Sequence, residues 1–384
     1  MKNLVSSAII IAFLALMLGI CSTVSAASQN DSASSDTKII TDMRGLDVAI
    51  PKDPMRVAIL DKGHILQTMV AMGVQDKLVA TGGLLSIGDK NSTDRDTLFL
   101  YPELLELPDW GYPLGGFNLE ALAATNPDLV IWMQSEYIND SQDGAKAMDT
   151  IENKFKIPLV VIRGAGTYED PSMDVHYQNI MILGVVFGKE DLAREIVDYM
   201  KEQIDLIQSR TVNIPDSEKP SVMIVGLRNE TTGVVWGSNW GDAKFSEEVA
   251  QIKNVYEEHS RTLMSAEQIV ALNPDVIVLA TNTVTPYPDI LYDDPAYASM
   301  RNITAILNKR VTSIGLLTWW GDFRLELPTI LMIEAKSAYP DKFADIDVYD
   351  WLAEYHMNLY GLDRAQAEEL ANIQKLTWMK EKGF

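Results

Sequence analysis

Hydrophobic and polar residues follow two different periods along most of the chain. Short apolar runs that predict buried strands lie at 56–60, 77–81 and 157–163, and stretches with helical spacing, such as 64–73 and 141–154, lie between them. An apolar residue at every third or fourth position indicates a helix, whereas a short apolar run between turn residues indicates a buried strand. Strands that alternate with helices predict βαβ units, and therefore an α/β fold with a mostly parallel sheet.

The region before the first buried strand has the pattern of a β-hairpin. Apolar and polar residues alternate through 38–60 and are interrupted by Arg44–Gly45 and by the proline-rich segment 51–54. Glycine and proline at such places mark turns. We expect a hairpin that leads into the strand at 56–60.

A long segment in the middle of the chain keeps helical spacing without a proline. Apolar residues recur with a period of about 3.6 residues through 174–210, softened only by Gly184 and Gly188. This segment is too long for an ordinary crossover helix, and a second α/β pattern follows it. We expect two related lobes, each a mostly parallel sheet with flanking helices, joined by one long backbone helix. The N-terminal lobe, the backbone helix and the C-terminal lobe are placed at 38–172, 173–211 and 212–384.

One short sequence occurs twice, once in each expected lobe. Residues 118–131 are NLEALAATNPDLVI, and residues 265–278 are SAEQIVALNPDVIV. Asn118 and Ser265 are good N-cap residues, and the Asn-Pro pair that follows stops a helix because a residue before proline is pushed out of the α region. Each copy therefore predicts a capped helix, a stop and a core strand.

Each copy also carries one acidic residue in the first turn of its helix. Glu120 and Glu267 occupy the same position in the two copies. The helix dipole favours an anion there, which explains one such glutamate. It explains the matched pair less well, because the two carboxylates would lie at equivalent points of two related lobes.

The N-terminus has the pattern of an export signal. Lys2 precedes the apolar run 4–20, and small residues follow it. This order predicts a signal peptide at 1–26 and a polar tether at 27–37. No later segment has an uninterrupted apolar run of that length, so we expect the body of the protein outside the cytoplasm, in the periplasm or at the outer face of the cytoplasmic membrane.

Cys21 offers an alternative to cleavage after Ala26. It is the only cysteine in the chain, and it would carry the lipid of a lipoprotein. Ile20 stands where bacterial lipoprotein signals have a small residue, which weighs against that interpretation. An uncleaved membrane anchor is a third alternative, since the apolar run is nearly long enough to span a bilayer. After cleavage the mature chain would have no thiol for a disulfide, a nucleophile or a metal.

Composition argues against a nucleic-acid partner. The chain has 384 residues, with 54 acidic against 32 basic side chains, a net charge of −22 and a pI near 4.5. No cluster of lysine and arginine interrupts this balance, and a polyanion is not attracted to such a surface.

These features together resemble one family. The early hairpin, the repeated motif with its glutamate, the long helical segment and the export signal are similar to ABC-importer substrate-binding proteins for ferric siderophores, haem and corrinoids. The resemblance covers 38–384. It implies a protein without a cofactor of its own that binds a small metal chelate carrying iron or cobalt, in the first place a ferric siderophore.

The same resemblance implies the partners. They are an ABC permease and its ATPase, and the membrane is contacted only through the permease or an N-terminal anchor. In this family the two matching glutamates dock onto arginines of the permease, which gives that role to Glu120 and Glu267. The long helix would be a stiff connection, so closure movements would be small.

Aromatic and arginine residues in expected loops are the candidates for ligand binding. Aromatic walls with a few polar groups are the usual design of such pockets. The segment 318–324, TWWGDFR, follows an expected strand, and the carboxyl ends of strands in open α/β sheets are where ligands bind. An arginine there would pair with an anionic chelate. The ligand-binding candidates are Trp110, Tyr112, Trp132, Arg228, Trp236, Trp240, Trp319, Trp320 and Arg324.

A metal site made of protein ligands alone is not expected. The four histidines are scattered and have no paired spacing. His64 lies between the first buried strand and its helix, in a loop that faces the cleft in the resembled family, and is the one candidate for an axial ligand to haem or another chelate.

An enzyme is not expected, because the chain has neither a G-x-S-x-G motif nor a carboxylate pair whose spacing singles it out. A ligand-binding sensory domain without a permease remains an alternative. Siderophore, haem and corrinoid all remain compatible with the aromatic loops.

Overall fold

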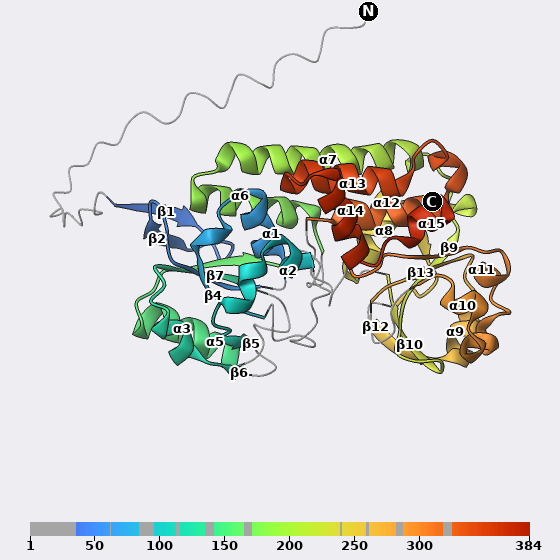
Figure 1. Cartoon of the computed structure of the whole chain (residues 1–384). Helices are drawn as coiled ribbons and strands as arrows, with labels where there is room; N and C mark the ends of the chain where they lie inside the picture. The colour runs from blue at the N-terminus through green and yellow to red at the C-terminus, as the bar shows by residue number, and fades with distance from the viewer. Residues whose placement is uncertain are drawn as a thin grey trace, which may run out of the picture. The chain divides into compact units, whose positions relative to one another are not determined.

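Two lobes, each with its own sheet and core, make up the part of the chain that the structure describes (Figure 1). The structure is a computed structural model. It describes residues 36–61, 63–83, 96–112, 116–134, 142–164, 171–238, 240–258, 261–281, 287–317 and 325–384. The helices and strands of the N-terminal lobe are β1 (Thr37–Thr41), β2 (Asp47–Pro51), β3 (Val57–Leu60), α1 (His64–Ala71), β4 (Leu78–Gly82), α2 (Asp96–Leu100), β5 (Gly111–Tyr112), β6 (Gly116–Phe117), α3 (Leu119–Ala124), β7 (Leu129–Gln134), α5 (Gln142–Asp149), β8 (Leu159–Arg163) and α6 (Met173–Phe187).

The sheet of the N-terminal lobe is parallel, as predicted. Among the described residues it has four strands in the order β4-β3-β7-β8. Alternate residues of β3 enter two different cores, with Val57 and Ile59 in one and Ala58 and Leu60 in the other. Successive side chains of a strand face opposite sides, so both faces of this sheet are covered.

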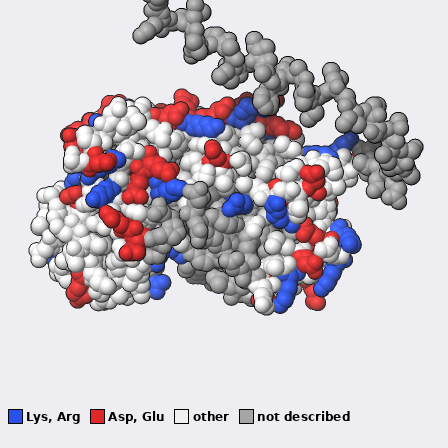
Figure 2. All heavy atoms as spheres, turned by 180° about the vertical axis from the view of Figure 1, so that it is seen from behind, with Lys and Arg blue, Asp and Glu red and all other residues white. Residues whose placement is uncertain are grey.

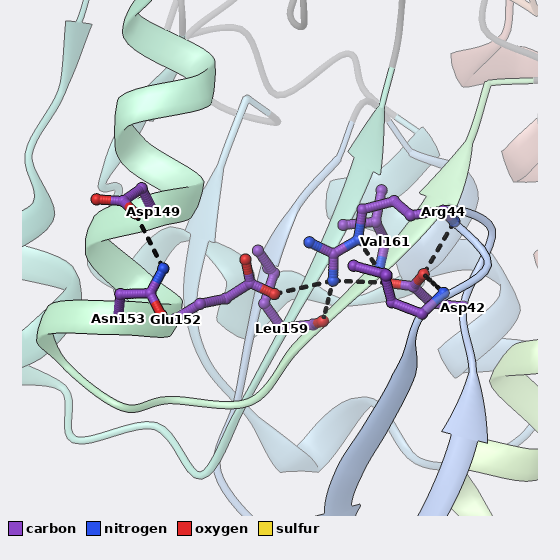
Figure 3. A network of polar contacts seen from close by, with 8 residues as sticks. Asp42, Arg44, Asp149, Glu152, Asn153, Leu159 and Val161 are labelled. Carbon is purple, nitrogen blue, oxygen red and sulfur yellow. Dashed lines mark hydrogen bonds and ion pairs between the residues drawn. The ribbon is translucent and has the colours of Figure 1, made fainter.

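The predicted hairpin is present and closes one edge of this sheet. The turn between β1 and β2 lies against the edge strand β8, where Met43 N donates to Val161 O at 3.0 Å and Val161 N donates to the Asp42 carboxylate at 3.1 Å (Figure 3). Arg44 holds the turn in place through Asp42 Oδ2, Leu159 O and Glu152 Oε1, at 2.8, 2.9 and 2.9 Å. Unpaired edge groups attract other chains, and the hairpin covers them.

The helix predicted at 173–211 is two helices. In the described range 171–238, α6 ends at Gly188, which has φ 63°, and α7 (Glu190–Thr211) begins after Lys189. Glycine adopts this left-handed conformation without strain, and Lys189 N donates back to Gly184 O at 2.7 Å, which closes the end of the helix. A Cβ on Gly184 would lie 2.5 Å from Ala193 Cβ, so the two helices pack together closely.

The long helix between the lobes is therefore α7 alone. Its first half packs into the N-terminal core and its second half into the C-terminal core. The residues of the first half are Ala193, Ile196, Val197 and Met200, and those of the second half are Ile204 and Ile207. Contributing to both cores is what makes α7 a backbone.

The C-terminal lobe has a mixed sheet. Within its described part the strand order is β12-β10-β9-β13-β14, with β11 beside β9. Strands β9, β11, β13 and β14 are parallel, whereas β10 is antiparallel to β9 and to β12. The elements of this lobe are β9 (Ser221–Leu227), β10 (Thr232–Trp236), α8 (Gly241–Val249), β11 (Lys253–Asn254), β12 (Arg261–Ser265), α9 (Ala266–Leu272), β13 (Val276–Leu279), α10 (Ile290–Asp293), α11 (Thr304–Leu307), β14 (Val311–Ser313), α12 (Leu327–Ala338), α13 (Val348–Tyr360), α14 (Arg364–Ile373) and α15 (Trp378–Lys382).

The last third of the chain also contributes to the N-terminal core. Leu325, Tyr355 and Leu359 belong to the same core as β3 and α1. Residues 37–384 form one compact unit, and the predicted lobe boundaries stay predictions.

Candidate functional site

The two copies of the repeated sequence have the predicted helix caps. Asn118 Oδ1 accepts a hydrogen bond from Ala121 N at 3.0 Å at the start of α3. At the start of α9, Ser265 Oγ accepts from Gln268 N at 3.3 Å while Gln268 Oε1 accepts from Ser265 N at 2.9 Å. Helix α9 ends at Asn273 and α3 ends one residue before Asn126, at Thr125, and the asparagine adopts a left-handed conformation in each copy, with φ 48° at Asn126 and φ 43° at Asn273.

The aspartate after each Asn-Pro pair has a role that the sequence did not indicate. Asp128 accepts hydrogen bonds from Met55 N and Arg56 N at 2.9 and 3.1 Å, at the start of β3. Asp275 accepts from Ser221 N and Ser221 Oγ at 2.9 and 2.8 Å, at the start of β9. Asp128 directly precedes β7 and fixes the start of β3, and Asp275 directly precedes β13 and fixes the start of β9. Each contact joins two parts of the chain that are far apart in sequence.

The two glutamates lie at equivalent, exposed positions. Glu120 and Glu267 are the second residues of α3 and α9. A hydrogen bond with the Ser265 side chain, together with one from its own backbone, lowers the pKa of Glu267. This carboxylate is therefore ionised at neutral pH.

Both glutamate helices lie on the face of their sheet opposite to α7. In the N-terminal lobe, α3 contributes Leu122 to one core and α7 contributes to the other. In the C-terminal lobe, α9 contributes Ile269 to the core that α7 does not enter. Figure 1 shows α7 along the upper edge and α3 and α9 low in the molecule. A partner that meets both glutamates would approach from the side away from α7.

Charge does not gather into one basic region on the face of Figure 2. Acidic and basic side chains are interspersed over its described part, in a chain of net charge −22.

Two predicted ligand-binding residues are core residues instead. Trp110 and Trp132 have 0% exposed surface, and their rings pack with each other and with Phe117, at centroid distances of 5.9, 5.7 and 5.2 Å. The indole of Trp110 donates to Ile59 O at 3.1 Å. Such large side chains stabilise a core by the area that they bury, and here that core is the N-terminal one.

The other predicted ligand-binding residues have different environments. Tyr112 belongs to the same core as Trp110, and Trp236 belongs to the C-terminal core with 4% exposed surface. Trp240 is half-buried, and the Arg261 guanidinium lies 5.0 Å from its ring centroid. Arg228 is exposed in the turn after β9. The last three candidates, Trp319, Trp320 and Arg324, lie outside the described residues.

A pair of buried histidines lies at the carboxyl edge of the N-terminal sheet. His64 is the first residue of α1, shortly after β3, and His176 is the fourth residue of α6, which follows β8 in the chain. Their ring centroids are 4.8 Å apart, and the two residues are 1% and 0% exposed. Burial, and then the neighbouring His64, hold the pKa of His176 well below its usual value, so its imidazole is neutral at pH 7.

Helix α1 also holds the start of α12. Gln67 Nε2 donates to Glu326 Oε1 at 3.1 Å and to Asp96 Oδ2 at 3.3 Å, and Gln67 Oε1 accepts from Leu325 N at 3.2 Å. Tyr360 Oη donates to Glu326 Oε1 at 2.7 Å. Gln67 thus ties the segment after 318–324 to the helix that begins with His64.

Local sequence patterns singled out His64 but neither His176 nor Gln67. His176 lies in a stretch whose helical spacing explained it fully, and Gln67 is an ordinary helix residue by sequence. Only contacts across the fold single them out. Among the described residues no group of three or more histidine, cysteine, aspartate or glutamate side chains is placed to hold a metal ion.

The segments that the structure describes contain no helix with both the length and the apolar character needed to cross a bilayer. The apolar run at 4–20, the predicted signal, lies outside those segments.

Comparison with known proteins gives the class. The chain is 25% identical over 343 residues to the molybdate-binding protein MolA of Haemophilus influenzae, which covers 84% of this chain and 91% of that protein. It is 26% identical over 342 residues to YvrC of Bacillus subtilis, an uncharacterized ABC transporter substrate-binding lipoprotein, with 86% and 96% covered. A periplasmic solute binding protein from Veillonella parvula has a similar structure, with a TM-score of 0.72 at 22% identity and 91% and 100% covered.

The two lobes, the connecting α7 and these relatives define a substrate-binding protein of the ABC transporter class, which works with a permease and an ATPase. The sequence profile of the periplasmic binding protein family matches residues 57–315. The chain belongs to the periplasmic binding protein family, and it is a binding protein, not an enzyme. The resemblance and the fold class predicted from the sequence are confirmed.

Proposed function

We propose that this protein captures a metal chelate outside the cytoplasm and delivers it to an ABC permease, which it contacts through Glu120 and Glu267. The observation that carries the proposal is the equivalence of the two carboxylates. Each is exposed at the second position of a capped helix, on the face of its sheet opposite to α7. Helix-start electrostatics alone does not require the same residue at the same place in both lobes.

Two acids on one side of the molecule suit a two-part partner. Each lobe would present one carboxylate to one half of the permease, and arginine is the side chain that pairs best with a carboxylate. Exposed ion pairs contribute little to affinity but fix orientation and the rate of encounter. Docking would therefore depend on the charge of Glu120 and Glu267 rather than on apolar area.

Transport assays with charge-reversed variants test the docking role. Glu120→Arg combined with Glu267→Arg should abolish uptake while ligand affinity stays near the wild-type value, and each single variant should lose part of the uptake. Glu195→Arg with Glu202→Arg, two exposed positions on α7, is the matched control for net charge and should transport normally. Normal uptake by the first double variant would show that these glutamates do not dock.

For the ligand we propose a chelate that carries iron or cobalt, in the first place a ferric siderophore. Haem and corrinoid are the alternatives within the same importer class. MolA, at 25% identity, is named for molybdate, so an oxyanion is the competing kind of ligand. The aromatic and arginine residues at 318–324 suit an anionic chelate, which is bound by stacking and by charge-assisted hydrogen bonds.

The absorption spectrum of protein purified from its native host separates these ligands. Haem, corrinoids and ferric siderophores absorb visible light differently, whereas molybdate does not absorb there. Elemental analysis of the same sample would give iron, cobalt or molybdenum. Molybdenum in stoichiometric amount would overturn the chelate part of the proposal and leave the docking part standing.

A binding domain that acts without a permease is the remaining alternative. It would have no use for an exposed carboxylate on each lobe. A pull-down with membranes that contain ABC permeases distinguishes the two functions, because only an importer component should be retained, and only with Glu120 and Glu267 intact.

A further inference from the structure

An exposed turn in the C-terminal lobe carries the acceptor pattern for N-glycosylation. Residues 229–231 are Asn-Glu-Thr, and Asn-x-Ser/Thr with any middle residue but proline is the acceptor sequence in exported proteins. The pattern alone is weak evidence, because a chain of this length contains several by chance. Two of its occurrences, at Asn229 and Asn302, lie among the described residues, and those at Asn30, Asn91 and Asn139 lie outside them.

The fold presents the Asn229 sequence to the solvent. All three of its residues are exposed, in the turn that joins β9 to β10. Asn229 Oδ1 accepts hydrogen bonds from Thr231 N and Thr231 Oγ1, both at 2.8 Å, so the asparagine side chain and the threonine hydroxyl lie together. Asn229 Nδ2, the atom that receives the sugar, makes no hydrogen bond within the part of the chain that the structure describes.

The Asn302 sequence has the opposite geometry. Its middle residue, Ile303, is 0% exposed and belongs to a core of the C-terminal lobe. The backbone N and the Oγ1 of Thr304 both donate to Asn273 Oδ1, at 2.9 and 3.0 Å. An enzyme that takes up the asparagine and the threonine together would first have to unfold the start of α11. The folded protein therefore offers Asn229 as an acceptor and withholds Asn302.

The reaction at Asn229 is a group transfer from an oligosaccharide that is linked to a lipid phosphate. A bond forms between Asn229 Nδ2 and C1 of the first sugar, and the bond between C1 and the phosphate oxygen breaks. The lipid phosphate leaves with the electron pair of that bond, and the amide nitrogen gives up one proton. Nothing is oxidised or reduced.

The turn lies directly beside the docking glutamate of the C-terminal lobe. Thr231 O accepts a hydrogen bond from Ala266 N at 2.8 Å, and Ala266 immediately precedes Glu267. Strand β10 and helix α9 lie side by side, low in this lobe (Figure 1). A glycan is bulky, so one on this turn would fill part of the space from which a partner reaches Glu267.

We propose that Asn229 is N-glycosylated after export and that the glycan restricts the access of the permease to Glu267. The second half of this inference rests on the proposed function, whereas the modification does not. Glycosylated protein binds its ligand normally but delivers it more slowly than unglycosylated protein. Since no acceptor sequence begins among the described residues of the N-terminal lobe, the restriction applies to one of the two docking carboxylates.

Mass spectrometry of the protein exported by its native host tests the modification. Trypsin cleaves after Arg228 and Lys244, so peptide 229–244 holds one acceptor sequence and peptide 302–309 holds the other. We expect the mass increment of an oligosaccharide on the first peptide and none on the second. Thr231→Ala should remove the increment, and Thr231→Ser should keep it. An unmodified peptide 229–244, or equal modification of both peptides, would overturn the assignment.

Uptake rates test the effect on docking. In the native host Thr231→Ala should transport faster than the wild type at unchanged ligand affinity, and Thr231→Ser should transport like the wild type. In a strain without the oligosaccharide transferase all three proteins should transport equally, which controls for the substitution itself. If the wild type carries the glycan and Thr231→Ala transports no faster, the glycan does not shield Glu267. A failure of the docking role, tested with the glutamate variants, leaves the peptide masses unchanged.

Discussion

Asp128 and Asp275 perform the same structural task in the two lobes. Each carboxylate follows an Asn-Pro pair and accepts hydrogen bonds from the residue or residues that begin the neighbouring parallel strand, Met55 and Arg56 in one lobe and Ser221 in the other. The repeated motif therefore has two acids with different environments. Its aspartate stabilises the neighbouring strand, whereas its glutamate is exposed on the helix.

Replacement of Asp128 by alanine should lower the free energy of unfolding. The N–H groups of Met55 and Arg56 would lose their acceptor and bond to water instead, because both hydrogen bonds are exposed, so we expect a cost of about 0.5–1.5 kcal/mol, the net contribution of a hydrogen bond. Urea unfolding measures the loss. Asp143→Ala is the control, since that side chain is 72% exposed and lies 3.9 Å from the Lys146 ammonium. Equal stability of the two variants would mean that the Asp128 hydrogen bonds contribute nothing.

The mature protein should begin at Ala27. Mass spectrometry of the exported protein decides this, because cleavage after Ala26 leaves a soluble protein when the envelope is opened. A diacylglycerol-modified Cys21 at the N-terminus would establish the lipoprotein alternative, which YvrC, described as a lipoprotein, represents among the relatives.

The segment 318–324 should contribute to ligand binding. Arg324→Ala is expected to weaken an anionic chelate by about 1.5–3 kcal/mol, the range for a hydrogen bond to a charged group. A corrinoid, held more by stacking, should lose less from Arg324→Ala and more from Trp319→Ala or Trp320→Ala. Titration of the intrinsic tryptophan fluorescence with the ligand gives these affinities. If all three variants bind like the wild type, the ligand lies elsewhere.

His356 should make the stability of the protein depend on pH. Burial lowers its pKa from 6.5 to about 4, so between these values the unfolded chain binds a proton that the folded chain does not. The contribution of His356 to the free energy of unfolding is therefore fully present above pH 6.5, and it is lost as the pH falls toward 4. From about pH 7.5 to about pH 5 the wild type should lose about 2 kcal/mol more than His356→Gln, as measured by urea unfolding at both values. Parallel pH profiles for the two proteins would contradict this.

Local patterns predicted the elements of the fold well. The hairpin at 38–51, the strands of the N-terminal sheet and the two capped helices are where apolar spacing and turn residues place them. These features depend on residues close in sequence, through backbone hydrogen bonds and side-chain caps. The break at Gly188 was visible as a glycine but not as a helix end, because a glycine within a helix and one that ends it differ only in φ.

The environment of the tryptophans could not be predicted from local sequence patterns. The sequence predicts Trp110 and Trp132 as ligand-binding residues, because both lie in aromatic segments near expected loops. Their burial against each other and against Phe117 shows that they belong to the core, and this packing joins the loop segment of Trp110 to the strand of Trp132, which no local pattern indicates.

The sequence alone determined the α/β class, the two-fold repetition and the position of the paired glutamates, since each of these is written in residue types at short spacing. The tertiary structure decided that α7 alone connects the lobes, that Asp128 and Asp275 hold neighbouring strands, and that His64 lies beside His176. These relations join residues that are far apart in the chain. The packing of helices on sheets brings them together, and no periodicity or motif encodes a distance of that kind.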